Sequence, residues 1–177
     1  MLRRRLLEAS LRPLLMLRPC YCRWPMAGDG TLHALVDATG GEIFTSTVTG
    51  PIHQQIEAQW GVMGDGRTAV IEMARASGLA MVPPRRRNPR TTTTFGTGQL
   101  LLEASKKGFN RVIVGLGGSA TNDGGAGMAM ALGFKFLDSR GKSLPSGGAA
   151  LADLDRIDTS GRVLKGFRAW KSLQRRM

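Results

Sequence analysis

A hydroxyl, an amide and a carboxylate stand together in Thr121-Asn122-Asp123, with glycines on both sides. The preceding apolar run, Val112–Val114, is β-branched and predicts a buried strand. An alanine- and methionine-rich run follows and predicts a helix that ends at Gly133. A strand that passes through glycines into a helix start lets backbone N–H groups and the positive helix end face an anion. Because the same turn carries a carboxylate, the pattern favours phosphoryl transfer over passive binding.

Each residue of this turn has an expected part in that chemistry. Thr121 and Asn122 are expected to orient the reacting groups, and Asp123 to contact Mg²⁺ or to accept a hydroxyl proton. Glycines also serve any tight turn, so they are weak evidence by themselves. The residues expected to hold phosphate oxygens are Gly115, Gly117, Gly118, Ser119, Gly124 and Gly125.

A dinucleotide-binding oxidoreductase is the main alternative. Gly115, Gly117 and Ala120 fit the G-x-G-x-x-A variant of the Rossmann fingerprint, and Asp138 ends the next apolar run about 20 residues on, where a ribose-binding acid is expected. Against this interpretation, Asp123 would place a negative charge close to the pyrophosphate.

Three further residues are candidate substrate contacts. Asp29 stands in a glycine-rich turn, Arg87 in the proline-interrupted run Pro83–Arg90, and Thr94 in a four-threonine run at a helix start. Arginine can bind phosphate or carboxylate by paired hydrogen bonds. Each also has a structural interpretation: Asp29 and Thr94 as helix N-caps, and the arginine run as a solvated loop. The isolated His53 is typical of a turn or surface residue.

The elements that must position these residues alternate along the chain. Their order predicts an α/β fold with a doubly wound, largely parallel sheet, flanking helices and one β-hairpin, as an incomplete domain. The hairpin is expected to turn at Gly50-Pro51. Helices are predicted over residues 31–39, 68–77, 99–107 and 128–132, and strands over 43–48, 54–62, 112–114 and 134–138.

Charge separates the middle of the chain from its ends. The 177 residues carry a net charge of +12, with 42% hydrophobic residues. Residues 1–25 hold six arginines and one acid, residues 162–177 hold six basic residues and no acid, and 13 basic and 12 acidic residues lie between them. A nucleic-acid-binding domain would carry its positive stripe on the folded part, so no specific nucleic-acid partner is expected. Non-specific binding of nucleic acid through the basic ends remains an alternative.

The ends also suggest a division of the chain. Residues 1–24 are expected to be a basic extension outside the fold, residues 25–161 the α/β region, and residues 162–177 a basic tail. A transit peptide is an alternative for residues 1–24, which are rich in arginine and poor in acids. Arg12 and Arg18 interrupt the apolar run there, so no membrane span is predicted. Cys20 and Cys22 form no metal set, and a reducing, cytoplasmic location is expected.

Several long and unusual motifs stand between about Pro25 and Gly161. They are PMAGDGT, VTGP, GDGRTAVIEMARASGLAMVPPRRRNPRTTTTFGTGQL, GLGGSATNDGGAGM and GGAALADLDRID. These motifs resemble those of the glycerate kinases of bacterial glycerate and glucarate catabolism.

The resemblance implies ATP-dependent phosphorylation of a glycerate hydroxyl, with glycerate and Mg·ATP as the small-molecule partners, in a protein longer than this chain. One departure concerns the turn before Thr31. In the family it resembles M-A-D-G-G-E-G-T, and this chain lacks two of those residues, including the glutamate. The sequence does not indicate an oligomeric state.

Overall fold

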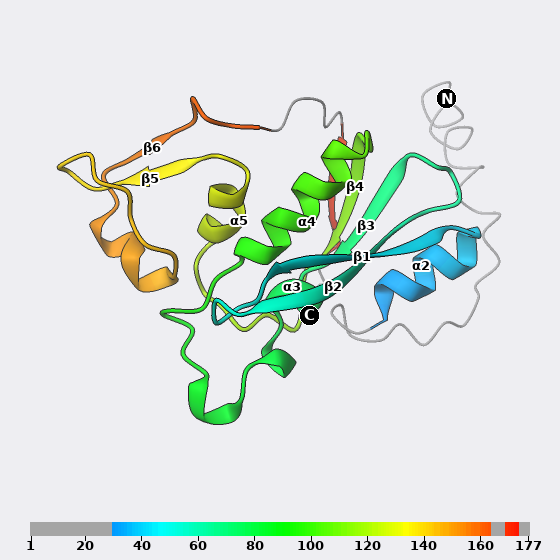
Figure 1. Cartoon of the computed structure of the whole chain (residues 1–177), viewed down its shortest axis with the longest axis horizontal. Coiled ribbons are helices and arrows are strands. Elements are labelled where there is room, and N and C mark those ends of the chain that lie inside the picture. The colour runs from blue at the N-terminus through cyan, green and yellow to red at the C-terminus, as the bar shows by residue number, and fades with distance from the viewer. Residues whose placement is uncertain (1–29, 164–168, 174–177) are drawn as a thin grey trace, which may run out of the picture.

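The computed structural model describes residues 30–163 and 169–173. A mixed sheet forms its centre, with helices on both faces, and a smaller lobe lies to one side (Figure 1). The main helices are α2 (Thr31–Thr39), α3 (Ala74–Ser77), α4 (Phe95–Lys106) and α5 (Ala126–Ala131), with 3-10 turns η2 (Leu79–Met81), η3 (Pro84–Arg86) and η4 (Gly148–Asp153). The strands are β1 (Glu42–Thr49), β2 (Gln55–Val62), β3 (Thr68–Glu72), β4 (Arg111–Gly115), β5 (Lys135–Leu137), β6 (Arg156–Asp158) and β7 (Ala169–Leu173).

The five-stranded sheet has the order β1-β2-β3-β4-β7. β1 and β2 form the predicted hairpin, paired from Glu42↔Val62 to Thr49↔Gln55, and β2 also pairs antiparallel with β3. Parallel pairing is confined to β3, β4 and β7, with Glu72 opposite Gly115 at the carboxyl ends of β3 and β4. The α/β class, the flanking helices and the hairpin are confirmed. Parallel pairing extends over a smaller part of the sheet than expected.

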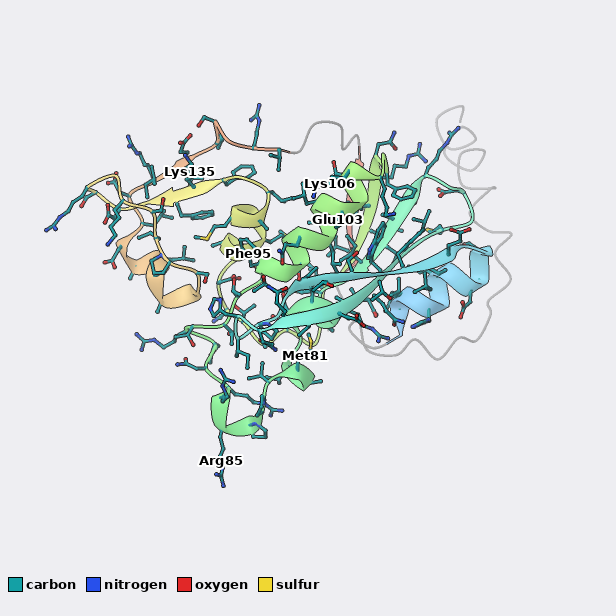
Figure 2. The ribbon with its side chains drawn as sticks, in the orientation of Figure 1. Met81, Arg85, Phe95, Glu103, Lys106 and Lys135 are labelled. Carbon is teal, nitrogen blue, oxygen red and sulfur yellow. The ribbon has the colours of Figure 1, made fainter. Side chains whose placement is uncertain are left out.

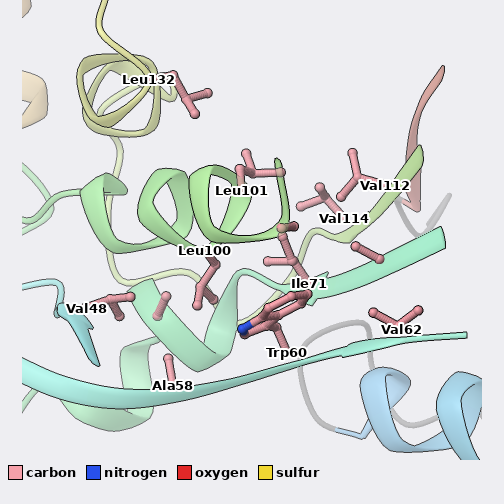
Figure 3. Packing of buried hydrophobic residues seen from close by; sticks show 13 residues of the cluster. Val48, Ala58, Trp60, Val62, Ile71, Leu100, Leu101, Val112, Val114 and Leu132 are labelled. Carbon is pink, nitrogen blue, oxygen red and sulfur yellow. The ribbon is translucent and has the colours of Figure 1, made fainter. Parts of the chain in front are cut away.

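Alternate residues of β3 enter two hydrophobic clusters, one on each face of the sheet. Val70 packs with Leu32 and Val36 of α2. Ala69 and Ile71 belong to the larger cluster beneath α4. Figure 3 shows Leu100 and Leu101 of α4 above Trp60 and Ile71 in this larger cluster. Burying each such aliphatic side chain contributes about 1.5–3 kcal/mol, so packing rather than helix propensity fixes α4 on the sheet.

The predicted helix over residues 68–77 is wrong in its first half. Thr68–Glu72 form β3, and only Ala74–Ser77 are helical. All five residues of β3 are buried because α2 covers one face and α4 the other, so the strand shows no polar/apolar alternation. A fully buried strand has the same apolar spacing as a buried helix, which misled the sequence interpretation.

Two other boundaries differ from expectation. Helix α4 begins at Phe95 rather than Gln99, although Gly96 and Gly98 occupy its first turn. A side chain at Gly98 would collide with the carbonyl of Met128, so this glycine allows α4 and α5 to pack closely. Residues 83–90, expected to be irregular, include the 3-10 turn η3.

The smaller lobe was only partly foreseen. β5, predicted as part of a strand over residues 134–138, pairs antiparallel with β6, which the sequence did not predict. Together they form a separate two-stranded sheet beside η4 (Figure 1). β7 lies within the predicted tail, at residues 169–173, while the predicted N-terminal extension lies outside the described residues. The division of the chain at residues 25 and 161 stays a prediction.

Candidate functional site

The Asp123 carboxylate is held by four protein donors. Its side chain is buried, with the residue 1% exposed, and Oδ2 accepts the Thr94 N–H at 2.8 Å and the Thr94 hydroxyl at 2.9 Å. The N–H groups of Gly125 and Gly127 donate to Oδ1 and Oδ2, each at 3.1 Å. Three of these donors meet Oδ2 and one meets Oδ1, so Oδ2 is fully engaged while Oδ1 keeps some acceptor capacity.

This network joins the starts of two helices. Thr94 precedes α4, and its hydroxyl oxygen accepts the Met128 N–H of α5 at 2.8 Å. The Asp123 main-chain oxygen accepts the N–H of Ala126, the first residue of α5, at 2.9 Å. Buried anionic groups at a helix start are stabilised by its unpaired N–H groups. Asp123 therefore fixes the glycine turn against the threonine run.

A cavity of about 520 Å³ lies directly beside this network. Met73 follows β3, and Val114 and Leu116 stand at the end of β4, so the cavity opens at the carboxyl ends of two parallel strands. In open α/β sheets ligands bind at that edge. The remaining lining residues are Thr94, Thr97, Gly117, Ser119, Thr121, Asn122, Asp123, Gly124, Gly125 and Met128.

The loop between β4 and α5 presents backbone N–H groups beside the cavity. Gly118, Gly124 and Gly125 have φ angles of 61°, 59° and 81°, in the left-handed region that glycine adopts at little cost. Within residues 30–163, no protein acceptor lies at hydrogen-bonding distance from the N–H groups of Gly117, Gly118 or Gly124. Unpaired N–H groups in a loop of this shape form a concavity suited to an anion.

Most of the predicted site residues meet at this cavity, and the others do not. Gly115 and Gly118 adjoin it along the chain without lining it. Arg87 lines a different hollow, with His53 and its neighbours. Asp29 lies outside the described residues. Those that line the cavity are Gly117, Ser119, Thr121, Asn122, Asp123, Gly124, Gly125 and Thr94.

Sequence reasoning missed the apolar half of the cavity. Met73 was assigned to a helix interior, although the β-branched residues Val70 and Ile71 were a signal for a strand ending just before it. Glu72 was also missed. It is fully buried, accepts the Thr31 N–H of α2 at 2.8 Å and pairs with Arg75 Nε at 3.3 Å.

The dinucleotide-binding alternative fails on geometry. Helix α5 begins at Ala126, so Ala120 lies in a loop rather than at the start of the helix that the fingerprint requires. Asp138 follows β5 in the separate small sheet, where its carboxylate accepts the N–H groups of Arg140 and Lys142 in a turn. It is therefore not the acid at the end of a neighbouring parallel strand.

Among residues 30–163, no three His, Cys, Asp or Glu side chains cluster closely enough to hold a metal ion. None of the helices in the described part of the chain has the length and apolar character needed to cross a membrane.

The fold and the cavity define the class: an α/β protein with a glycine-rich strand-to-helix loop at the carboxyl edge of its parallel strands. The chain belongs to the glycerate kinase family, whose model matches residues 7–167. The predicted resemblance is thereby confirmed.

Several relatives share most of this chain. It is 55% identical over 143 residues to a glycerate kinase of Bacillus subtilis, covering 80% of this chain and 37% of the relative. It is 50% identical over 143 residues to a glycerate 2-kinase of Escherichia coli, covering 80% and 38%. A crystal structure from Salmonella typhimurium LT2, described as a candidate glycerate kinase 2, matches with a TM-score of 0.75 at 48% identity, covering 78% of this chain and 38% of that one. The chain thus spans less than two fifths of the length of these proteins.

Proposed function

We propose that this chain forms part of a glycerate kinase, an enzyme that transfers the γ-phosphoryl group of ATP to a hydroxyl of glycerate. The observation that carries the proposal is the cavity beside Asp123, bordered by a loop whose glycine N–H groups face no protein acceptor among the described residues. The relatives from Bacillus subtilis and Escherichia coli, named glycerate kinase and glycerate 2-kinase, are 55% and 50% identical to this chain over 143 residues.

In phosphoryl transfer the main tasks of the protein are to position the reactants and to stabilise negative charge. In the proposed site the N–H groups of Gly117 and Gly124, which line the cavity, bind phosphate oxygens, a role that glycine suits because no side chain blocks the approach. The cavity of about 520 Å³ lies within the range of small-ligand sites, and a phosphate group has room there.

Among the predicted catalytic residues, Asn122 is the best placed to contact a ligand. It is exposed, it lines the cavity, and its side-chain amide has no hydrogen-bond partner within residues 30–163. The Thr121 hydroxyl is already engaged, since it donates to the Thr92 carbonyl at 2.7 Å and accepts the Asp123 N–H at 3.2 Å. We therefore assign substrate orientation to Asn122 and loop geometry to Thr121.

For Asp123 we propose a positioning role. Its side chain is buried and four protein donors already hold the carboxylate, three of them at Oδ2, so it is better suited to ordering the loop than to the predicted Mg²⁺ contact or general-base function. By ordering the loop, Asp123 holds the glycine N–H groups toward the cavity.

The test is nucleotide binding by the 177-residue chain, followed by thermal unfolding with and without Mg·ATP. A ligand that binds only the folded state stabilises it, by about 2.7 kcal/mol at 100 times its dissociation constant, and so raises the unfolding temperature. We expect Mg·ATP to protect the chain, NAD at the same concentration to give no protection, and Asn122→Ala to weaken the effect. A well-folded chain indifferent to Mg·ATP would refute the proposal.

A further inference from the structure

The segment that connects α3 to α4 projects as a lobe (Figure 1). A second hollow lies at this lobe. It encloses about 540 Å³, and we call it the arginine basin. Its walls come from two places far apart in sequence, the turn of the β1–β2 hairpin and the segment around η3. The lining residues are Ile52, His53, Arg85, Arg86, Arg87, Asn88 and Thr91.

Positive charge is concentrated at this hollow. From Gly78 to Leu102 the chain carries four arginines and no acidic residue. In the part of the chain that the structure describes, no carboxylate lies within 4.0 Å of these guanidinium groups. Arg87 is fixed in place because its Nε donates to the Val82 carbonyl at 3.2 Å. The side chain of Arg85 extends outward from the tip of the lobe (Figure 2).

The facing wall is held in an unusual conformation. His53 has a φ angle of 68°, the left-handed region that non-glycine residues seldom adopt, and it is the sole such residue between 30 and 163. Its N–H donates to the Gly50 carbonyl at 3.1 Å, and the Pro51 carbonyl accepts the Thr93 N–H at 3.0 Å. The hairpin turn is thus joined to the threonine run, and the exposed imidazole is held at the basin. Rare backbone conformations that the surroundings enforce are concentrated at binding sites.

One segment of the chain connects the basin to the Asp123 cavity. Asn88 is fixed because its carbonyl accepts the N–H groups of Thr91 and Thr92 at 3.1 and 3.2 Å. The Pro89 carbonyl accepts the Asn122 N–H at 3.3 Å. The segment that lines the basin at Thr91 therefore reaches the cavity at Thr94, three residues later.

We propose that the arginine basin binds a small dianion carrying a phosphate ester and a carboxylate, at a site separate from the Asp123 cavity. The volume suits a small molecule rather than an extended polymer. Guanidinium groups recognise phosphate and carboxylate through paired hydrogen bonds, and two arginines beside an imidazole suit a ligand with two acidic groups. The basin site does not depend on the proposed reaction. Only the choice of phosphoglycerate as the probe rests on the proposed function, since that is its class of product.

The experiment is a titration of the ¹⁵N-labelled 177-residue chain with 3-phosphoglycerate, followed by amide chemical shifts, with inorganic phosphate and glycerate as single-group comparators. We expect saturable shifts at His53, Asn88 and Thr91, and weaker binding of either comparator. Arg86→Gln/Arg87→Gln should weaken binding of 3-phosphoglycerate by about tenfold or more, the factor for losing one charge-assisted hydrogen bond.

A matched double variant tests whether position matters rather than charge alone. Arg67→Gln/Arg140→Gln also removes two charges, from the β2–β3 turn and from the turn after β5, and neither residue lines the basin. It should lower the affinity less than Arg86→Gln/Arg87→Gln does. Equal loss in the two double variants would overturn the proposal, because it would reduce the effect to overall charge.

Other outcomes also decide the matter. Shifts confined to Asn122 and Gly124 would place the anion in the Asp123 cavity and overturn the basin site. Tighter binding of a single-stranded oligonucleotide, lost in Arg86→Gln/Arg87→Gln, would overturn the small-molecule assignment. The proposed function is judged separately by Mg·ATP protection. Protection without shifts at His53 would refute the basin alone, and shifts at His53 without protection would refute the kinase proposal alone.

Discussion

Thr94 donates both its N–H and its hydroxyl to the carboxylate of Asp123, at 2.8 and 2.9 Å, from 29 residues earlier in the chain. The same hydroxyl oxygen accepts the Met128 N–H at 2.8 Å. One threonine thus connects the start of α4, the glycine turn and the first turn of α5. The candidate site depends on this contact because the turn has little regular structure of its own.

The first prediction tests the hydroxyl. Thr94→Val keeps the shape but leaves a buried carboxylate with one donor fewer and the Met128 N–H without its acceptor. We expect a loss of about 2–3 kcal/mol of unfolding free energy, the range for a hydrogen bond to a buried charge. Urea unfolding measures it. Thr94→Ser retains the hydroxyl and should lose clearly less, whereas equal losses would mean that the hydroxyl contributes nothing.

The second prediction separates a positioning role from a catalytic one at Asp123. Asp123→Asn replaces one acceptor oxygen with an amide NH₂, a donor that would face the donor groups of Thr94, Gly125 or Gly127. The variant should therefore lower both the unfolding temperature and the protection by Mg·ATP. A general base would behave differently. Its loss would leave the unfolding temperature unchanged and lower turnover by about 10² or more. That second pattern, measured in a full-length relative carrying the same change, would contradict the positioning role.

The third prediction concerns the space at Gly127. A Cβ there would lie 2.8 Å from the Phe95 nitrogen and 2.9 Å from Asp123 Oδ2, and would collide with the Thr93 hydroxyl. Gly127→Ala should therefore cost more than the roughly 1–3 kcal/mol typical of overpacking, because these neighbours form the hydrogen-bonded network.

Gly124→Ala is the matched control for that change. Its Cβ would meet only the Leu151 side chain, at 3.9 Å. The loss of unfolding free energy should therefore be limited to the strain of an alanine at a φ of 59°, about 1 kcal/mol. Thermal unfolding of the two variants makes the comparison. Equal destabilisation would indicate that the α4–α5 junction is looser than described.

The fourth prediction uses pH. The Thr68 hydroxyl and then the Arg67 N–H, both donors to Asp65 in the β2–β3 turn, lower the pKa of this carboxyl. A lowered folded-state pKa contributes stability above the unfolded value of about 3.9, and this stability disappears as pH falls through the folded pKa. Asp65→Asn should therefore have a lower unfolding free energy than the parent chain at pH 7. The two unfolding free energies should approach each other below about pH 4.

Because Asp65 is exposed, the difference in unfolding free energy between the parent and Asp65→Asn should be small and should decrease in salt. Asp153→Asn is the control, since Asp153 is also exposed and accepts no hydrogen bond within residues 30–163. Urea unfolding at several pH values supplies the measurement. A gap between parent and Asp65→Asn that stays constant down to pH 3 would contradict the proposed linkage.

Local sequence determined much of this protein. Residues 43–62 alternate and turn at Gly50-Pro51, and they form the β1–β2 hairpin. The run Val112–Val114 forms the centre of β4, and the glycines beyond it form the loop at the cavity. These features were predictable because periodicity and turn chemistry act between neighbours in the chain.

Other features depended on which elements cover one another. Residues 68–72 are a strand because α2 and α4 bury both of its faces, and no local pattern marks that burial. Asp123 looked like a reactive acid in sequence, but its carboxylate is buried and held by Thr94 and the start of α5. Arg87 was expected in the same site, but the hairpin turn at His53 meets it in a separate basin. A side chain's chemistry is set by what lies within hydrogen-bonding distance, and contacts between distant segments exist only after the chain has folded.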